Sequence, residues 1–515
     1  MIMNMKKWLL IGLLCCIATG LRAQDFMPPD TTKTPTERTK IHIVHADQFH
    51  KTAGSEAVRL LGRVHIRHDS THFYCDSAYY FEEQNSFNAY QNVHINVNDS
   101  IDMYSRTMRY DGDLRFAQFF DEVRMMDDST LLETEYMTYD RDLHLACYPH
   151  HGVTTRGDKR LVSEIGYYKD DLKEFRFYQK VEVTSPKYQM FTDTLFYNTR
   201  IEKMWFLGPT KIINEDNTLE GKHGYYLTER DLAFLDDDPV MYNETQRMVA
   251  DSMLYDRQRG FAKAMHTIQL LDTAYKVVLF GEYAEVWEKK GFSFATDSAY
   301  VVYYEGGDSL FITSDTMFYH FKTERNEVEK IVGRKNVRFY KSDMQGRCDT
   351  MTYMMADSTI RMRVEPVLWT DDSQLTADYI DIKVAHHKID SVLQRGSAFT
   401  ISRDSVEGYN QIKGMSMVSK FKEGEIDHVL VNDEARTISW LREDDGELIG
   451  INVASAKNMR ILMGKDGISR IKYYQAVNET LYPEKDLKES DRYLEGFKWL
   501  EESRPKSRRD VVPGG

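Results

Sequence analysis

An aspartate followed by serine or threonine recurs along the chain, and it is the pattern that could most directly do chemistry. Each copy runs on through apolar residues to a tyrosine, as in residues 76–80 (DSAYY), 193–197 (DTLFY), 315–319 (DTMFY) and 349–353 (DTMTY). Carboxylates brought together could hold a metal ion or work as a general acid and base. A catalytic pair would not recur in every repeat, however. We therefore interpret these aspartates as structural residues that hydrogen-bond the backbone at the turn entering each strand.

The same tripeptides have a second interpretation. Asp-Ser or Asp-Thr followed by a small or apolar residue resembles the acceptor site for O-glycosylation in some exported bacterial proteins. Residues 76–78, 193–195, 251–253 and 297–299 fit this pattern. An intact mass equal to that of the bare polypeptide would exclude the modification.

Histidines are concentrated early in the chain, where 10 of the 16 lie between His42 and His151. With Cys75 nearby, a zinc site is conceivable. His65 and His68 are three residues apart, however, which places them on opposite faces of a strand. No Cys-x-x-Cys or His-Glu-x-x-His motif accompanies them. We predict no metal site here, only solvated histidines on strand faces.

Motifs of catalysis and nucleotide binding do not stand out. We find no Gly-x-Ser-x-Gly, no Ser/His/Asp order and no activated cysteine. The glycines at 221–224 and 306–307 lack the Lys-Ser/Thr and the following helix of a phosphate loop, so they are expected to join strands. The sequence therefore predicts a protein that is not an enzyme and has no cofactor.

Tyrosine recurs with a constant step of 29 residues. The series is Tyr110, Tyr139, Tyr168, Tyr197, Tyr226 and Tyr255. A period in this range indicates one small unit stacked on copies of itself. We expect the rings to pack between strands with their hydroxyls at the wet edge, although a ladder that stacks on sugars is the alternative.

A second apolar segment lies between the tyrosines. Its markers are Val93, Val123, Val153, Val181 and Val240, which are about 30 residues apart except where one copy carries Thr210 instead. The segments alternate apolar and polar residues, are rich in Val, Ile, Thr, Tyr and Phe, and are separated by Asp, Asn and Gly, which is typical of half-buried strands and turns. One repeat then consists of strand, turn, strand, turn, and we expect it to add one strand to each of two sheets.

The inner faces of such strands align into a continuous apolar trough, because the same side of every strand points inward. The residues that we predict to line it are Val64, Ile66, Val93, Ile95, Val123, Met125, Val181 and Val183. The expected fold class is all-β.

The chain is expected to contain six segments. Residues 1–23 carry a basic start, a short apolar run and a Leu-Arg-Ala end, which predicts a signal peptide cleaved after Ala23. The remaining segments are a linker (24–40), regular repeats (41–270), looser repeats that continue the stack (271–480), a short amphipathic helix (481–502) and a disordered tail (503–515).

The charge balance excludes some partners. The net charge is −14, and removal of residues 1–23 leaves 64 basic against 81 acidic residues, or −17. Nucleic acid binding depends on neutralising phosphates with Lys and Arg, so we expect no nucleic acid partner. Cys75, Cys147 and Cys348 remain after cleavage, and we expect them to be buried thiols.

Three neighbouring stretches carry a family resemblance. Residues 41–47 (IHIVHAD), 61–66 (LGRVHI) and 74–79 (YCDSAY) resemble the OstA-like repeat, which occurs in the periplasmic lipopolysaccharide-transport protein LptA and in the N-terminal domain of LptD. The likeness extends, with varying strength, over most of residues 41–475. The chain is longer than a minimal LptA-like bridge, and it lacks the barrel strands and terminal aromatic residue expected of LptD.

The resemblance implies an elongated antiparallel β-jellyroll whose apolar interior shields acyl chains. The implied function is a non-enzymatic periplasmic bridge for lipopolysaccharide or a similar lipid, associated with the outer membrane and paired end to end with homologous jellyrolls or with itself. Two alternatives stay open: a cell-surface carbohydrate-binding or adhesive β-solenoid, and a structural spacer with a filled core.

Overall fold

The computed structural model describes residues 39–305, 308–322, 327–370, 372–385, 388–404, 408–422, 425–443, 446–464 and 467–512 of the 515-residue chain. The predicted signal peptide lies outside the described residues, and so does the linker apart from its last two residues. The chain divides into two compact units, residues 1–150 and 151–515, and each is considered by itself.

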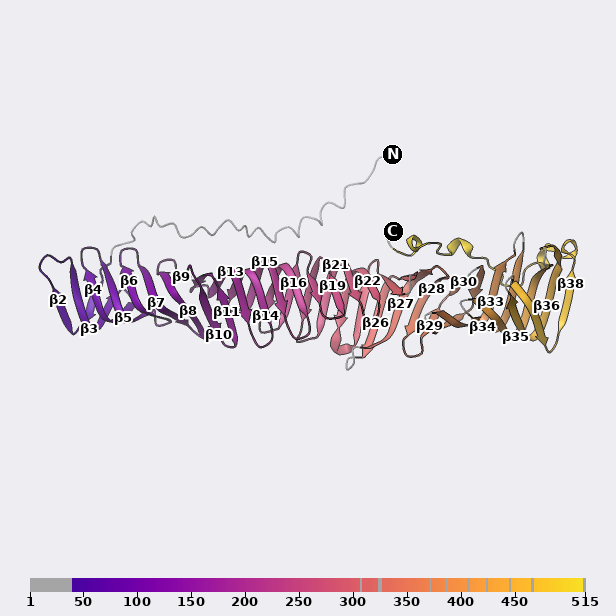
Figure 1. The fold of residues 1–515 in the computed structure, drawn as a ribbon, viewed down its shortest axis with the longest axis horizontal. Helices are drawn as coiled ribbons and strands as arrows, with labels where there is room; N and C mark the ends of the chain where they lie inside the picture. Colours follow the sequence, from indigo (N-terminus) through magenta and orange to yellow (C-terminus); the bar gives the residue numbers. More distant parts are fainter. Residues whose placement is uncertain are drawn as a thin grey trace, which may run out of the picture. The chain divides into compact units, whose positions relative to one another are not determined.

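The first unit is built from long antiparallel strands joined by tight turns (Figure 1). Its strands are β1 (His42–His45), β2 (Gln48–Lys51), β3 (Ala57–His68), β4 (Thr71–Phe81), β5 (Ser86–Val97), β6 (Ile101–Asp111), β7 (Phe116–Asp127), β8 (Thr130–Asp140) and β9 (Leu145–Tyr148).

The second unit repeats the same construction. Its first strands are β10 (Gly152–Arg156), β11 (Lys159–Ser163), β12 (Ile165–Lys169), β13 (Glu174–Thr184), β14 (Gln189–Asn198), β15 (Lys203–Ile213), β16 (Thr218–Leu227), β17 (Leu232–Asp236), β18 (Val240–Tyr242), β19 (Gln246–Val249), β20 (Ser252–Asp256), β21 (Phe261–Asp272), β22 (Val277–Trp287), β23 (Phe292–Thr296) and β24 (Tyr300–Glu305). The following strands are β25 (Asp308–Thr313), β26 (Thr316–Lys322), β27 (Glu327–Lys341), β28 (Met344–Met354), β29 (Thr359–Arg363), β30 (Val367–Thr370), β31 (Ser373–Thr376), β32 (Tyr379–Ala385), β33 (Lys388–Arg403), β34 (Tyr409–Lys422), β35 (Glu425–Arg442), β36 (Leu448–Gly464), β37 (Gly467–Tyr474) and β38 (Asn478–Tyr482).

Short 3-10 helices complete the second unit. They are η1 (Glu288–Lys290), η2 (Glu484–Asp486), η3 (Glu489–Asp491), η4 (Glu501–Ser503) and η5 (Arg508–Asp510). None of the helices in the described part of the chain is long and apolar enough to cross a membrane. The predicted all-β class is confirmed, because the described residues pair as antiparallel strands throughout both units.

Every second long strand carries a bulge near its middle, and the paired strands bend there. On β5 and β7 the bulge consists of two successive left-handed residues, Gln91 and Asn92 on β5 and Asp121 and Glu122 on β7, and the pairing register shifts there. Opposite a bulge a strand can divide into two separate arms, such as β11 and β12, which both pair with the bulged β13. The bend sends the two arms of one strand to two different walls.

We name the walls by the residues that repeat on them. The valine wall holds the arms with Val64, Val93 and Val123 in the first unit and Val181 in the second. The tyrosine wall holds the arms with the periodic tyrosines. One 29-residue repeat therefore supplies two bent strands, each with an arm in both walls. The prediction that each repeat adds one strand to each of two sheets was wrong. Alternation of apolar and polar residues does not reveal that a single strand bends and contributes to both walls.

The periodic tyrosines occupy one register row of the tyrosine wall. In the first unit the row passes through Phe87, Tyr110, Ala117 and Tyr139, each directly opposite the next. In the second unit it passes through Tyr168, Phe175, Tyr197, Met204, Tyr226, Ala233 and Tyr255. All six periodic tyrosines are buried, so they pack between strands, as predicted.

The C-terminal segment differs from its prediction. Residues 481–502 contain the end of β38 and isolated 3-10 turns, not an amphipathic helix. In the predicted tail, Arg504 bonds to Gln345 of β28 and Val511 is buried. The buried Gln374 donates to the Lys498 carbonyl and accepts from the Leu500 N–H, both at 2.7 Å. Gln411 makes the same pair of bonds to Arg492 and Leu494 at 2.8 Å.

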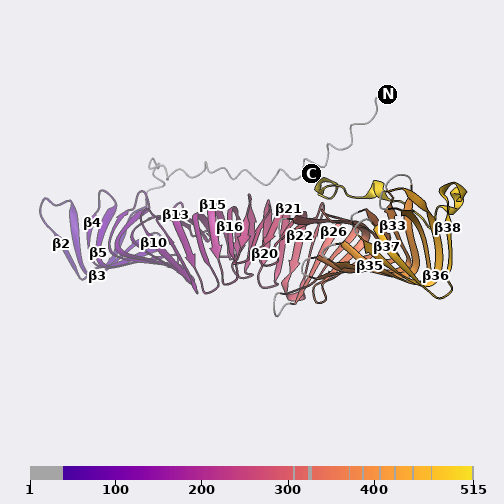
Figure 2. The same ribbon diagram turned by 45° about the vertical axis from the view of Figure 1, so that its right-hand side comes forward.

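These side-chain amides take up the backbone groups that a helix would otherwise pair internally, so the segment stays extended. It returns along the strands, from β34 past β31 toward β28, where Arg504 donates to the Gln345 side chain at 2.7 Å. Both views show this return path above the last strands (Figures 1 and 2).

Candidate functional site

The valine-wall residues predicted for the first unit all face its interior. They lie on three strands: Val64 and Ile66 on β3, Val93 and Ile95 on β5, and Val123 and Met125 on β7. Each is at most 2% exposed. The row that contains Ile66, Ile95 and Met125 continues across the intervening strands through Phe73 and Met103.

Aromatic side chains from the opposite wall fill part of this interior. The ring centroid of Phe73, from the valine wall, lies 4.6 Å from that of Tyr110 and 5.2 Å from that of Phe87, both on the tyrosine wall. The predicted trough residues of the first unit therefore belong to a packed interior, and lipid contact with them stays a prediction.

Val181 and Val183 on β13 are equally buried in the second unit. The register row of Val183 continues through Met190, Ile212, Leu219, Met241, Met248, Leu270, Leu279, Val301 and Ile312. One wall of the second unit thus carries an unbroken apolar row from β13 to β25.

The facing tyrosine wall changes from large to small residues along its length. A second inward row begins with Phe177, Leu195 and Phe206 on β13, β14 and β15. On β21, β22 and β23 the same register positions hold Ala264, Ala284 and Ala295. Replacing phenylalanine and leucine with alanine at fixed wall spacing removes the side chains that would fill the interior.

An apolar cavity of about 1080 Å³ opens where the small residues lie. The valine wall lines it with Met248, Leu270, Leu279, Val301 and Ile312, and the tyrosine wall lines it with Tyr255, Ala262, Ala284, Ala295, Tyr319, Ile331, Tyr353 and Ile360. This volume exceeds the roughly 300–1,000 Å³ of an ordinary small-molecule site. The apolar lining suits hydrocarbon better than a polar metabolite.

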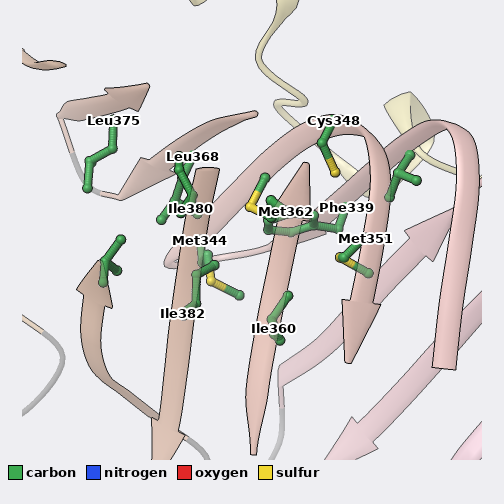
Figure 3. Packing of buried hydrophobic residues seen from close by; sticks show 12 residues of the cluster. Phe339, Met344, Cys348, Met351, Ile360, Met362, Leu368, Leu375, Ile380 and Ile382 are labelled. Atoms are coloured by element: carbon green, nitrogen blue, oxygen red, sulfur yellow. The ribbon is translucent and has the colours of Figure 1, made fainter. Parts of the chain in front are cut away.

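The far end of the cavity is closed by a packed cluster. Met344, Met351 and Ile360 line the cavity and also belong to this cluster, in which Phe339, Met362 and Leu368 are buried beside them (Figure 3). Cys348 lies in the same cluster, and burial raises the pKa of its thiol to about 12. Burial has the same effect on Cys75 in the first unit, so both are inert packing residues, as expected.

Tyrosine hydroxyls border the interior. In the cavity, the buried hydroxyl of Tyr319 has no hydrogen-bond partner within the described residues, and its burial raises its pKa. Outside the cavity the hydroxyls are paired: Tyr197 donates to Glu202 at 2.6 Å, and Arg141 donates to Tyr110 at 2.8 Å. The cavity therefore has one buried polar atom that a bound polar group could satisfy.

Comparison with known proteins assigns part of the chain. Residues 38–193 match the family described as OstA-like protein. These residues belong to the OstA-like family.

Among solved structures, LptH from Pseudomonas aeruginosa is similar to this chain. It is described as the LptA homologous periplasmic component of the conserved lipopolysaccharide transport device. The match has 11% sequence identity and a TM-score of 0.22, and it covers 27% of this chain and 95% of LptH. A comparison with curated proteins finds no match.

The recurrent acidic residues of the OstA-like part do not cap turns at strand entry. They lie at the bulges, and their side chains bind a residue 16 positions later on the next strand. Asn92 donates to Asp76 at 2.8 Å, and Arg63 donates to Asp47 at 2.7 Å. These contacts agree with a structural role for the aspartates. The predicted location at the turn entering each strand was wrong, because the sequence does not show where a strand bends at a bulge.

The bulge also bears on the glycosylation pattern. Ser298 lies on an exposed bulge, whereas Ser252 is only 9% exposed. The four tripeptides are therefore not equally accessible.

The early histidines of the OstA-like part divide into two groups. His65, His72 and His94 lie on the outer face of the valine wall and stack with Tyr74 and each other; for example, the His65 and Tyr74 centroids are 4.6 Å apart. His68 is fully buried, and its Nδ1 lies 2.8 Å from the Tyr110 hydroxyl. The prediction of solvated histidines was wrong for His68, because it is the last residue of β3 and faces the border of the interior.

The cavity-lining residues beyond the OstA-like part were missed by sequence reasoning. The signal that could have found them is the replacement of Phe and Leu by Ala264, Ala284 and Ala295 at one register position. Reading that signal requires the strand register, which the loosened spacing after Tyr255 obscures.

Proposed function

We propose that the chain is a non-enzymatic lipid-binding bridge of the periplasm that carries lipopolysaccharide, or a lipid of similar chemistry, toward the outer membrane. The observation that carries this proposal is the apolar cavity of about 1080 Å³ between the two walls of the second unit. Burial of each methylene of an acyl chain contributes about 0.8 kcal/mol, so apolar walls can bind hydrocarbon without specific polar contacts. The OstA-like family match supports the assignment.

Export to the periplasm follows from the signal peptide proposed for residues 1–23. We further propose that the chain pairs end to end with homologous jellyrolls or with itself. The exposed β2 at one end of the first unit and the exposed β38 at the end of the second offer unpaired strand edges, and such edges are templates for an added strand.

Photo-crosslinking tests the cavity. Leu279 on β22 lines the cavity, whereas its neighbour Phe280 points to the other face and stacks on Tyr300 at 4.5 Å. A photoreactive residue at position 279 should capture lipid in the cell envelope, and the same residue at position 280 is the matched control. Equal capture at both positions, or capture at neither, would contradict the proposal.

Native mass spectrometry of protein purified from its own envelope identifies the cargo. The expected result is a retained species with the mass of an acylated lipid. A protein that carries nothing under conditions that preserve lipid complexes would favour the structural-spacer alternative.

A further inference from the structure

The two walls meet along a border that is bridged by charged side chains. The hairpin ends of the valine wall at residues 69–70, 157–158 and 214–217 face hairpin ends of the tyrosine wall at residues 112–115, 141–144, 199–202 and 257–260. We call this border the seam. In each unit, carboxylates on one side of the seam bind cations on the other.

In the first unit, Asp69 is the acidic partner. Its carboxylate lies 3.2 Å from the Arg115 guanidinium and 3.7 Å from that of Arg141, and both arginines come from the tyrosine wall. Arg141 also donates to the Tyr110 hydroxyl at 2.8 Å. The ion pair thus lies directly on the hydroxyl that borders the apolar interior.

In the first seam cluster of the second unit the charges are reversed: the acidic residue comes from the tyrosine wall and the basic residues come from the valine wall. Glu202 of the tyrosine wall lies 2.9 Å from Arg156 and 3.3 Å from Lys159 of the valine wall, and it accepts from the Tyr197 hydroxyl at 2.6 Å. The side chains of Arg156, Lys159 and Glu202 are at most 20% exposed. Charges shielded to this extent attract each other more strongly than the charges of an exposed surface pair.

The second seam cluster of this unit contains Asp216 and Arg257. Their charged groups are 3.3 Å apart, and Arg257 also lies 3.8 Å from Asp231, which accepts from the Tyr226 hydroxyl. Asp216 also lines the cavity, so this cluster lies at the cavity border. Tyr275 lines the cavity too, and its hydroxyl accepts from the Val328 N–H at 3.4 Å, a neutral and long bond.

A lipid whose acyl chains lie between the walls must place its head group at the seam, because the head group cannot enter the apolar interior without a large desolvation cost. A phosphate head group presents oxygens to an arginine in the same forked geometry as a carboxylate. It can therefore replace Asp216 as the partner of Arg257, the seam cation at the border of the cavity.

We propose that the seam cation Arg257 is the binding site for the phosphate of a lipid head group whose acyl chains lie in the cavity, and that Asp216 is released from Arg257 when the phosphate binds. This inference rests on the proposed function and adds the head-group chemistry to it. It also explains how a chain of net charge −14 accepts an anionic lipid: a cation stands where the head group lies, and its own carboxylate neutralises it when the site is empty.

Exchange of partners makes a prediction that a purely structural ion pair does not. Removing the carboxylate should raise the affinity for a phosphate-bearing lipid, because no ion pair has to be broken before the cation binds the phosphate. Removing the cation should lower that affinity. If the pairs only hold the walls together, both changes lower stability and neither raises affinity.

The test uses the purified full chain and three probes: dioctanoyl phosphatidic acid, dioctanoylglycerol with the same acyl chains and no phosphate, and inorganic phosphate. Asp216→Asn should bind phosphatidic acid on the order of fivefold more tightly than the wild type, and Arg257→Gln should bind it more weakly by a similar factor. Binding of dioctanoylglycerol should change little in either variant. Glu202→Gln is the matched control, because Glu202 and Arg156 form a 2.9 Å seam pair that does not line the cavity.

The outcomes separate the two proposals. Equal binding of both lipids by every variant overturns the seam site and leaves the cavity proposal standing, whereas failure of both lipids to bind overturns both. Inorganic phosphate that binds as tightly as phosphatidic acid would show a free-anion site, which also overturns the head-group assignment. If Asp216→Asn does not fold, Asp216→Ser replaces it, with the same gain expected.

Discussion

Ala264 and Ala284 lie directly opposite each other on β21 and β22, at the register position that Leu195 and Phe206 occupy on β14 and β15. The strands, their pairing and the inward direction of these residues are the same in both places. Only the side-chain volume differs, and with it the interior changes from filled to hollow. The volume of the interior in this part of the fold thus follows residue size at one repeated position.

The first prediction concerns the alanines of the cavity. Ala284→Phe should fill the cavity and reduce the amount of lipid that copurifies with the protein, with a change in unfolding free energy of no more than about 2 kcal/mol. Quantitative lipid extraction and chemical denaturation measure the two effects.

Ala117→Phe is the contrasting variant. Ala117 is buried between Tyr110 and Tyr139 in the packed first unit, so the added ring should cost about 1–3 kcal/mol by overpacking. If both variants retain lipid equally well, the cavity is not where the lipid binds.

The second prediction concerns acid stability. Burial alone would raise the pKa of Glu202, but hydrogen bonds from Tyr197, Arg156 and Thr228 and the charge of Lys159 lower it from its ordinary value of 4.5 to about 2. A lowered pKa adds stability that is fully present above pH 4.5 and is lost as the pH falls toward 2.

Thermal unfolding of the wild type and of Glu202→Gln over this pH range measures the contribution. The difference in Tm should be constant above about pH 5 and shrink as the pH falls toward 2. A difference that stays constant down to pH 2 would show that the carboxylate is not held ionised by its neighbours.

The third prediction concerns a bulge. Gly396 has a φ of +73°, and a Cβ added at this position would overlap a carboxylate oxygen of Asp378. Gly396→Ala should therefore lower the unfolding free energy by more than the roughly 1 kcal/mol that the left-handed conformation alone costs. Denaturation with urea measures the loss.

Gly157→Ala provides the control for backbone strain. Gly157 has a φ of +58°, and a Cβ added there would meet no other atom within 4 Å, so its substitution should cost only the conformational part. Equal losses at the two positions would mean that the Asp378 carboxylate moves aside freely.

The fourth prediction concerns the C-terminal segment. Gln374→Ala leaves the Lys498 carbonyl and the Leu500 N–H without the partner that now binds them at 2.7 Å, and it should destabilise the segment by about 2 kcal/mol. Hydrogen exchange should show faster exchange around residue 500, with strands of the first unit as the internal control. Unchanged protection there would show that Gln374 does not hold the segment.

Much of this structure was accessible from the sequence, for identifiable reasons. The step between Tyr110 and Tyr139 is visible because each repeat places one tyrosine at the same register position, and the alternation around Val93 and Ile95 is visible because a strand exposes alternate residues to the interior. These are local regularities, and they were sufficient to predict the strands, the inward residues and the stacked repeat.

The bulges and the C-terminal segment were not accessible in this way. The bend at Gln91 and Asn92 has no strict residue requirement, since other strands use Gly62 or Asp121 at the same place. The segment around Leu494 has helical periodicity, but Gln411, 83 residues earlier, binds its backbone instead. Contacts so distant in sequence leave no local pattern.

The sequence by itself therefore determined that the chain is a stack of antiparallel strands with an apolar inside, because period and alternation are properties of neighbouring residues. The tertiary structure alone decided where that inside is hollow and where the seam carries charge. Both depend on side chains that meet across walls, such as Arg156 with Glu202, or across strands, such as Ala284 with Ala295, and the register that brings them together is a property of the folded stack.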